Sequence, residues 1–190
     1  MLVVKDITEL LNRPGSVVVM PTDTIYGLVA RAKDPIAVNR LYQLKDRHSK
    51  PGTLLGLNID ELTNLGLTRK YLKAVEQFWP GAISVVIPTS NPSLDYLTQG
   101  LPDLAVRIPD DPFVAKVLAA CGPLITSSAN LPLQPPANNI DQAKKYFANK
   151  VDAYFDGGNL ENRQPSTIIR MIDDSIEVLR AGSVKLPEYE

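Results

Sequence analysis

Hydroxyl, carboxylate and cationic side chains gather at several points of this 190-residue chain. The first group, Thr-Asp-Thr-Ile-Tyr-Gly at residues 22–27, directly follows the apolar run 17–20 and a proline. Polar side chains that bunch where a buried strand ends are typical of ligand sites in α/β proteins. A proline-led turn in which Thr22 or Asp23 caps the backbone explains the same residues. This stretch alone leaves a ligand site and a turn as equal alternatives.

Three further groups offer positive charge or hydrogen-bond donors to an anion. Residues 45–50 contain three cations at the end of an expected helix, and these could neutralise a polyphosphate or complement the helix dipole. Arg107 ends an apolar strand, where it needs an internal ion-pair partner or an anionic ligand. The hydroxyls and amide of residues 126–130 follow another strand, where they could bind phosphate oxygens or cap a turn.

The last groups lie near the end of the sequence. An Asp-Gly-Gly loop at 156–158 precedes Pro-Ser-Thr at 165–167, and Arg180 closes an apolar run. A hairpin with a surface arginine explains these without any ligand. Taken together, the groups supply hydroxyls and cations with no evident covalent nucleophile. Such a set suits an anionic substrate, because phosphoryl and nucleotidyl transfer depend mostly on positioning and charge neutralisation.

Several classes of site are excluded by what the sequence lacks. It contains no phosphate-binding P-loop, no Gly-x-Gly-x-x-Gly motif and no Gly-x-Ser-x-Gly elbow. With His48 and Cys121 as the single residues of their types, a His/Cys zinc cage is ruled out, and Cys121 is expected in the core. Without an apolar leader or a long apolar run, we expect no membrane span and a cytoplasmic protein. The net charge of −1 means that an RNA partner would need a local basic patch.

The elements that must position these groups alternate between helix and strand early and crowd into strands late. The expected helices are 6–12, 34–44, 68–78, 113–120 and 140–147, and the expected strands are 16–20, 54–59, 83–87, 104–108, 123–125, 151–155, 167–170 and 177–180. For the helix that Asp34 caps, the predicted buried face is Ile36, Val38, Leu41 and Leu44. The pattern predicts a single α/β domain over residues 1–190, with a mixed, open, twisted sheet flanked by helices.

In their order along the chain, these groups resemble the YrdC-like family of threonylcarbamoyl-AMP synthases. The resemblance rests on PTDTIYGL at 21–28, KDR at 45–47, WPG at 79–81, AVRIP at 105–109, SSAN at 127–130, PSTI at 165–168 and RAG at 180–182. Each motif alone is weak evidence for the family, whereas seven motifs in the family's order make a specific match. The match spans nearly the whole chain and leaves no room for the C-terminal domain of longer family members. Departures include His48 after the Lys-x-Arg pair and Ala-Ile-Ser at 82–84 in place of a proline and a threonine.

The resemblance implies a reaction with three substrates. L-threonine and bicarbonate form a carbamate, which attacks the α-phosphate of ATP to give threonylcarbamoyl-AMP and pyrophosphate, with Mg²⁺ expected beside ATP. A partner transferase complex then modifies adenosine 37 of tRNA, and direct binding of tRNA or double-stranded RNA stays open. The implied threonine contacts are Thr22, Tyr26, Arg107, Thr126 and Ser166; the implied catalytic and ATP-binding residues are Lys45, Arg47, Ser128 and Asn130, with Arg180 also at the nucleotide.

Other functions are compatible with the same residues. One is a non-catalytic RNA- or nucleotide-binding module, such as a YciO-type relative, that uses a basic face. Another is a carbamoyl-transfer relative that acts on a different amine.

Overall fold

The computed structural model describes residues 4–46, 50–172 and 175–186. The strands are β1 Val18–Pro21, β2 Tyr26–Arg31, β3 Thr53–Leu55, β4 Ile83–Pro88, β5 Asp103–Arg107, β6 Leu124–Ser128, β7 Ala153–Tyr154, β8 Thr167–Ile172 and β9 Ser175–Arg180. The α-helices are α1 Val4–Leu11, α2 Pro35–Leu44, α3 Ile59–Leu65, α4 Arg69–Ala74, α5 Asp95–Thr98, α6 Pro112–Cys121 and α7 Ile140–Phe147. Short 3₁₀ turns span Glu76–Phe78 and Pro92–Leu94.

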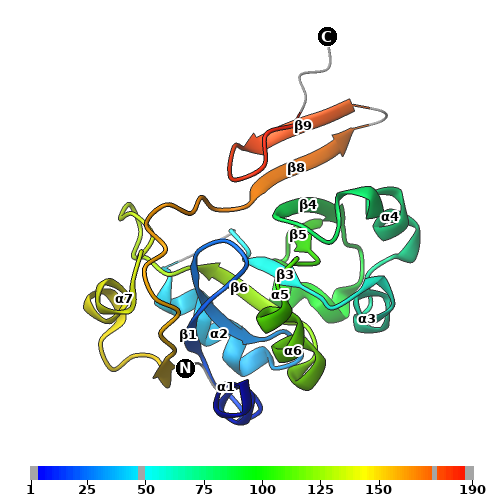
Figure 1. The fold of residues 1–190 in the computed structure, drawn as a ribbon. Coiled ribbons are helices and arrows are strands. Elements are labelled where there is room, and N and C mark those ends of the chain that lie inside the picture. Colours follow the sequence, from blue (N-terminus) through cyan, green and yellow to red (C-terminus); the bar gives the residue numbers. More distant parts are fainter. Residues whose placement is uncertain (1–3, 47–49, 173–174, 187–190) are drawn as a thin grey trace.

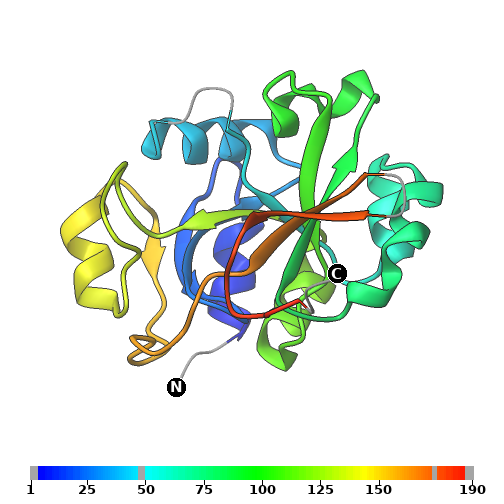
Figure 2. The same cartoon turned by 90° about the horizontal axis from the view of Figure 1, so that it is seen from above.

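Within the described residues, nine strands form one sheet in the order β7-β1-β2-β6-β3-β5-β4-β8-β9. The pairs β1–β7, β3–β5 and β4–β8 are parallel and the other neighbouring pairs are antiparallel, so the sheet is mixed and open. Figure 1 shows α7 near the β7 end and α3 and α4 beside β4, with the β8–β9 hairpin above the rest. Figure 2 shows this hairpin crossing over the molecule. The predicted fold class is confirmed.

Two cores lie on the two faces of the sheet. Along β1, Val19 belongs to the core under α2, α5 and α7, whereas Val18 and Met20 belong to the core under α1 and α6. Successive side chains of a strand point to opposite faces, so one strand serves both cores. This alternation decides which strand residues reach the functional site.

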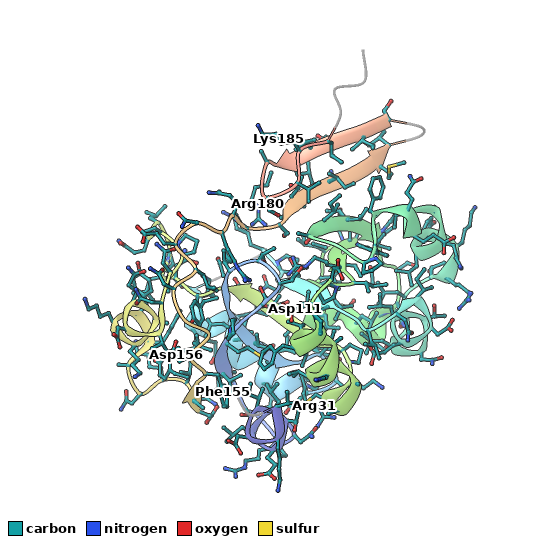
Figure 3. All side chains as sticks on the ribbon, in the orientation of Figure 1. Arg31, Asp111, Phe155, Asp156, Arg180 and Lys185 are labelled. Carbon is teal, nitrogen blue, oxygen red and sulfur yellow. The ribbon has the colours of Figure 1, made fainter. Side chains whose placement is uncertain are left out.

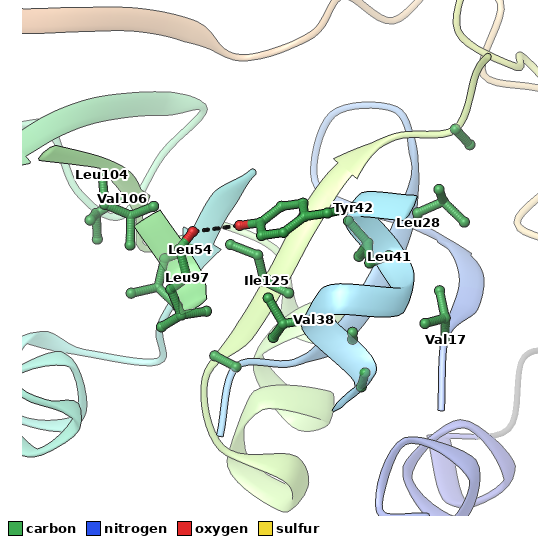
Figure 4. Close-up of a cluster of buried hydrophobic side chains, with 14 of the residues drawn as sticks. Val17, Leu28, Val38, Leu41, Tyr42, Leu54, Leu97, Leu104, Val106 and Ile125 are labelled. Carbon is green, nitrogen blue, oxygen red and sulfur yellow. Dashed lines mark hydrogen bonds between the residues drawn. The ribbon is translucent and has the colours of Figure 1, made fainter. Parts of the chain in front are cut away.

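Helix α2 begins as its sequence predicts. Asp34 caps it by accepting hydrogen bonds from the N–H groups of Ile36 and Ala37. Of the predicted buried face, Val38 and Leu41 are buried, Leu44 is half-buried and Ile36 is 68% exposed; Ala37 and Tyr42 complete the buried stripe. Tyr42 reaches across the core, and its hydroxyl donates to the Leu97 carbonyl at 2.6 Å (Figure 4). The phenol therefore satisfies a buried carbonyl as well as filling volume.

The other differences from prediction concern both helices and strands. Helices α3 and α5 were not predicted, and the helix predicted at 68–78 ends at Ala74, with a separate 3₁₀ turn at Glu76–Phe78. Strand β2 was missed because its residues are buried on both faces, with no polar alternation to reveal a strand. The strand predicted at 54–59 ends at Leu55, since Asn58 caps α3 through a hydrogen bond from Glu61 N–H. Residues 126–128, expected after a strand, lie inside β6 and pair with β2 and β3. Cys121 is buried in the core, as expected.

Candidate active site

A pocket of about 150 Å³ opens over the middle of the sheet. Its lining includes seven of the ten residues that the sequence selects: Thr22, Tyr26, Arg107, Thr126, Ser128, Ser166 and Arg180. In β5 and β6, residues 104, 106 and 125 enter one core, so Arg107, Thr126 and Ser128 point to the other face. Helices α1 and α6 cover the rest of that face. The polar pocket is thus the part of this face that the helices leave uncovered.

The turn between β1 and β2 combines both interpretations of residues 22–27. Thr22 Oγ1 donates to the Ile25 carbonyl at 2.8 Å and lies 3.1 Å from Thr24 Oγ1, so the threonine closes its own turn. Thr22 also lines the pocket. Thr22 therefore both closes its own turn and lines the pocket.

Arg107 is held by an internal carboxylate and a hydroxyl. Its Nη2 donates to Asp23 Oδ1 at 2.9 Å, and its Nη1 donates to Ser84 Oγ at 3.0 Å. Both members of the ion pair are about 4% exposed. Asp23 Oδ2 and Arg107 Nε have no hydrogen-bond partner among the described residues. The ion pair is made through one nitrogen and one oxygen rather than through two parallel hydrogen bonds, so the guanidinium keeps an unused donor at Nε.

Burial acts against charge on both members of this pair. Burial raises the pKa of Asp23 above its ordinary value of 3.8, and the attraction of Arg107 opposes this only in part. Burial likewise lowers the pKa of Arg107, and Asp23 opposes that shift. Asp23 and Arg107 therefore each offset part of the cost of burying the other's charge.

The raised pKa of Asp23 predicts a pH dependence of stability. Above pH 3.8 the unfolded state loses this proton before the folded state does, so the folded state binds more protons. The free energy of unfolding of the wild type, relative to Asp23→Asn, should therefore fall as pH rises from 3.8 to the folded pKa. Urea unfolding of both proteins across this range measures the difference. If the free energy of unfolding of the wild type, relative to Asp23→Asn, rose with pH instead, the attraction of Arg107 would outweigh burial.

Lys45, Ser128 and Asn130 come together from α2 and the end of β6. The Lys45 ammonium is 2.7 Å from both the Ser128 carbonyl and Asn130 Oδ1, and it also donates to the Asn130 carbonyl. Ser128 Oγ donates to the same Oδ1 at 2.6 Å. Lys45 of the predicted Lys-x-Arg pair thus lies in one cluster with Ser128 and Asn130 of the predicted Ser-x-Asn pair. Arg47 lies outside the described residues.

Thr126 is fixed by its strand neighbours. Its Oγ1 donates to the Leu28 carbonyl at 3.0 Å. A Cβ on Gly27 would lie only 2.5 Å from this hydroxyl, and a Cβ on Gly52 only 2.5 Å from the Thr126 carbonyl. Glycine at both positions lets the strands bring Thr126 to the pocket.

Ser166 and Arg180 close the pocket on the side of the β8–β9 hairpin. Figure 3 shows Arg180 between this hairpin and the body of the molecule. Its Nη2 donates to the Ser166 carbonyl at 2.7 Å and to Ser166 Oγ at 3.0 Å. A Cβ on Gly182 would lie 2.2 Å from the Pro165 carbonyl, so only glycine allows this close return of the chain.

Tyr26 has a structural task besides its place in the pocket lining. Its hydroxyl accepts from Gly157 N–H at 2.7 Å and donates to the Gly158 carbonyl at 2.9 Å. Asp156 Oδ1 lies 3.3 Å from the same hydroxyl. The phenol therefore anchors the glycine loop, while its predicted contact with threonine stays a prediction.

We expect Tyr26→Phe to loosen this loop. Two backbone groups of this loop, Gly157 N–H and the Gly158 carbonyl, lose their partner, which should lower the free energy of unfolding by about 0.5–1.5 kcal/mol. Amide exchange at residues 157–158 should accelerate. Tyr71→Phe is a matched control because Tyr71 is 40% exposed. Equal exchange in both variants and the wild type would contradict the anchoring role.

The sequence predicts Asp23 only as an alternative cap of its turn, and Ser84 only as a departure from the family pattern; neither was predicted as a partner of Arg107. The signal that was available is the cost of burying Arg107, which demands an acceptor. A second, larger hollow of about 540 Å³ beside α3, α4 and α6 is lined by none of the ten predicted site residues.

Two absences concern the described part of the chain. There, no group of three or more His, Cys, Asp or Glu side chains is placed to hold a metal ion. In the same residues, no helix has the length and apolar character needed to cross a membrane.

Residues 10–182 match the sequence profile of the Sua5/YciO/YrdC family, which carries the description "telomere recombination". The chain belongs to the Sua5/YciO/YrdC family. The threonylcarbamoyl-AMP synthase of Bacillus subtilis is 30% identical over 185 residues, which are 95% of this chain and 54% of that protein. A putative threonylcarbamoyl-AMP synthase of Mycobacterium tuberculosis is 35% identical over 177 residues, or 90% of this chain and 81% of that protein.

A solved family member gives the same fold. The structure of Pyrococcus abyssi Sua5 in complex with L-threonine superposes with a TM-score of 0.82 at 27% identity, covering 94% of this chain and 54% of that one. The chain thus spans about half the length of the Bacillus subtilis and Pyrococcus abyssi relatives. The predicted resemblance to this family is confirmed.

Proposed function

We propose that this protein forms threonylcarbamoyl-AMP from L-threonine, bicarbonate and ATP and releases pyrophosphate, as a nucleotidyltransferase. The observation that carries this proposal is the pocket itself: Thr22, Arg107, Thr126 and Ser166 converge there from four separate segments. A family member with the same fold binds L-threonine, which supports the same ligand here.

The threonine half of the site would use Arg107 and the hydroxyls around it. A guanidinium matches a carboxylate in shape and charge, and Arg107 lines the pocket while Asp23 and Ser84 hold it in place. The pocket is smaller than the 300–1,000 Å³ typical of drug-sized ligands, so it suits an amino acid better than a whole nucleotide. ATP would therefore extend beyond this pocket.

The ATP half would involve the cluster of Lys45, Ser128 and Asn130, with Arg47 and Arg180 as further cations. Lys45 brings a buried positive charge to the end of β6, where negative phosphate oxygens would be stabilised. Mg²⁺ is proposed to enter with ATP as part of that substrate. These residues would hold the triphosphate while the reaction takes place at its α-phosphorus.

The bonds that change involve the substrates alone. The threonine amine and bicarbonate form a carbamate, with loss of water. A carbamate oxygen then attacks the α-phosphorus, the bond to the β-phosphate bridging oxygen breaks, and pyrophosphate leaves with that oxygen. The protein contributes orientation and charge neutralisation rather than a covalent nucleophile. The product would serve the t⁶A modification of tRNA through a partner transferase, in the cytoplasm.

The direct test is pyrophosphate release from ATP that depends on both threonine and bicarbonate. The control is the double variant Lys45→Ala with Arg47→Ala, and turnover no higher than this control would overturn the proposal. A panel of amino acids in the same assay distinguishes a synthase that acts on threonine from an enzyme that acts on another amine. A non-catalytic YciO-type or RNA-binding protein would instead bind RNA in a salt-sensitive manner, with no effect of threonine on nucleotide binding.

A further inference from the structure

One buried serine joins the two arginines that border the pocket. Ser84 in β4 has no exposed surface. Its Oγ accepts a hydrogen bond from Arg107 Nη1 at 3.0 Å and lies 3.0 Å from Ser166 Oγ. Ser166 Oγ in turn accepts from Arg180 Nη2 at 3.0 Å. A continuous line of hydrogen bonds, which we term the serine relay, thus runs from Arg107 through Ser84 and Ser166 to Arg180.

The hydrogen atoms along this relay do not balance internally. Each serine hydroxyl accepts from one arginine and carries one hydrogen of its own. The two oxygens share a single hydrogen bond, so one hydroxyl hydrogen serves that bond. The hydrogen of the other serine has no acceptor within the relay.

Burial decides where the spare hydrogen lies. Ser84 is fully buried and does not line the pocket, so a spare hydrogen on Ser84 would be an unsatisfied buried donor. Ser166 lines the pocket. The favoured arrangement has Ser84 donate to Ser166, which leaves the Ser166 hydrogen to donate to whatever occupies the pocket.

We propose that Ser84 is a positioning residue that fixes Arg107 and orients the Ser166 hydroxyl as a donor toward an anionic oxygen of the substrate. Ser84 itself does not touch the substrate. It also ties the end of the β8–β9 hairpin to the Arg107 side of the pocket through Ser166 and Arg180. In naming the substrate as L-threonine, this inference rests on the proposed function.

The relay predicts how three serine variants bind L-threonine. Ser84→Ala should raise the Kd about tenfold, since Arg107 loses an acceptor and Ser166 loses the hydrogen that orients it. Ser84→Thr keeps the hydroxyl and should bind within about threefold of the wild type. Ser16→Ala is the matched control, because this buried serine has no hydrogen-bond partner for its Oγ among the described residues.

Titration calorimetry with L-threonine on the four proteins is the first measurement. Wild-type affinity in Ser84→Ala would overturn the relay, and so would a loss in Ser84→Thr as large as in Ser84→Ala. The rescue by threonine distinguishes orientation through the hydroxyl from a general loss of packing at this position.

Amide hydrogen exchange without ligand is the second measurement, and it does not depend on the proposed function. Ser183 N–H donates to the Pro165 carbonyl and Val184 N–H to Thr167 Oγ1, beside the Ser166–Arg180 contact. Both amides should exchange faster in Ser84→Ala and at wild-type rates in Ser84→Thr and Ser16→Ala. If the wild type binds no L-threonine, the proposed function fails. Unchanged exchange in Ser84→Ala would then overturn the relay by itself.

Discussion

Replacing Lys45 with methionine is expected to lower threonine-dependent pyrophosphate release at least about a hundredfold, the effect typical of losing one preorganised donor. The ammonium group is buried and donates to the Ser128 carbonyl and to both oxygens of Asn130. Methionine keeps most of the volume but removes the charge and these three hydrogen bonds. The Ser128–Asn130 segment should then lose its fixed position beside the pocket.

The assay is pyrophosphate release at saturating ATP and threonine, together with urea unfolding. The loss of these hydrogen bonds should also lower the free energy of unfolding by about 1–3 kcal/mol. Lys70→Met is the matched control because Lys70 is an exposed lysine on α4. Full turnover in Lys45→Met would refute the assignment of Lys45 to the catalytic cluster, whereas loss of folding alone would assign it to structure.

Replacing Arg107 with methionine is expected to weaken L-threonine binding about a hundredfold, since the substrate carboxylate loses a charged donor. The same change leaves Asp23 buried without its partner. Breaking a buried ion pair on one side costs about 3–5 kcal/mol of folding free energy, less here to the extent that Asp23 takes up a proton. Affinity and stability should therefore both fall.

A double variant separates the two effects. Arg107→Met with Asp23→Asn removes the orphaned carboxyl, so part of the stability should return while threonine affinity stays low. Arg69→Met is the control, because its ion pair with Asp60 lies at the exposed surface, where solvent screens the attraction. Threonine affinity that recovers together with stability would mean that Arg107 is a structural residue only.

Much of the fold could be predicted because its signals are local. The caps Asp34, Asp111 and Asn139 each precede a helix that begins where the sequence indicates. Signals that depend on the whole sheet were missed. Strand β2 lies between β1 and β6 and is covered on both faces, so nothing in its own pattern distinguishes it from a buried loop.

Seven of the ten predicted site residues line one pocket, but their hydrogen-bond partners were not predicted. Arg107 was expected to need an ion-pair partner or an anionic ligand, and the structure gives it Asp23, 84 residues away in the chain. Tyr26 was predicted to contact threonine, and in the structure its hydroxyl holds the loop at 157–158.

By itself, the sequence determined the family, the mixed α/β class and the types of side chain that gather at the pocket. Those properties follow from local apolar patterns and from motifs that short segments carry. Only the tertiary structure decided which buried polar groups satisfy one another. Ser84 shows the difference most clearly, because a serine within an apolar strand has no local signal of function. It acquires a role only when strand register and the return of the β8–β9 hairpin bring Arg107 and Ser166 within 3.0 Å of its hydroxyl.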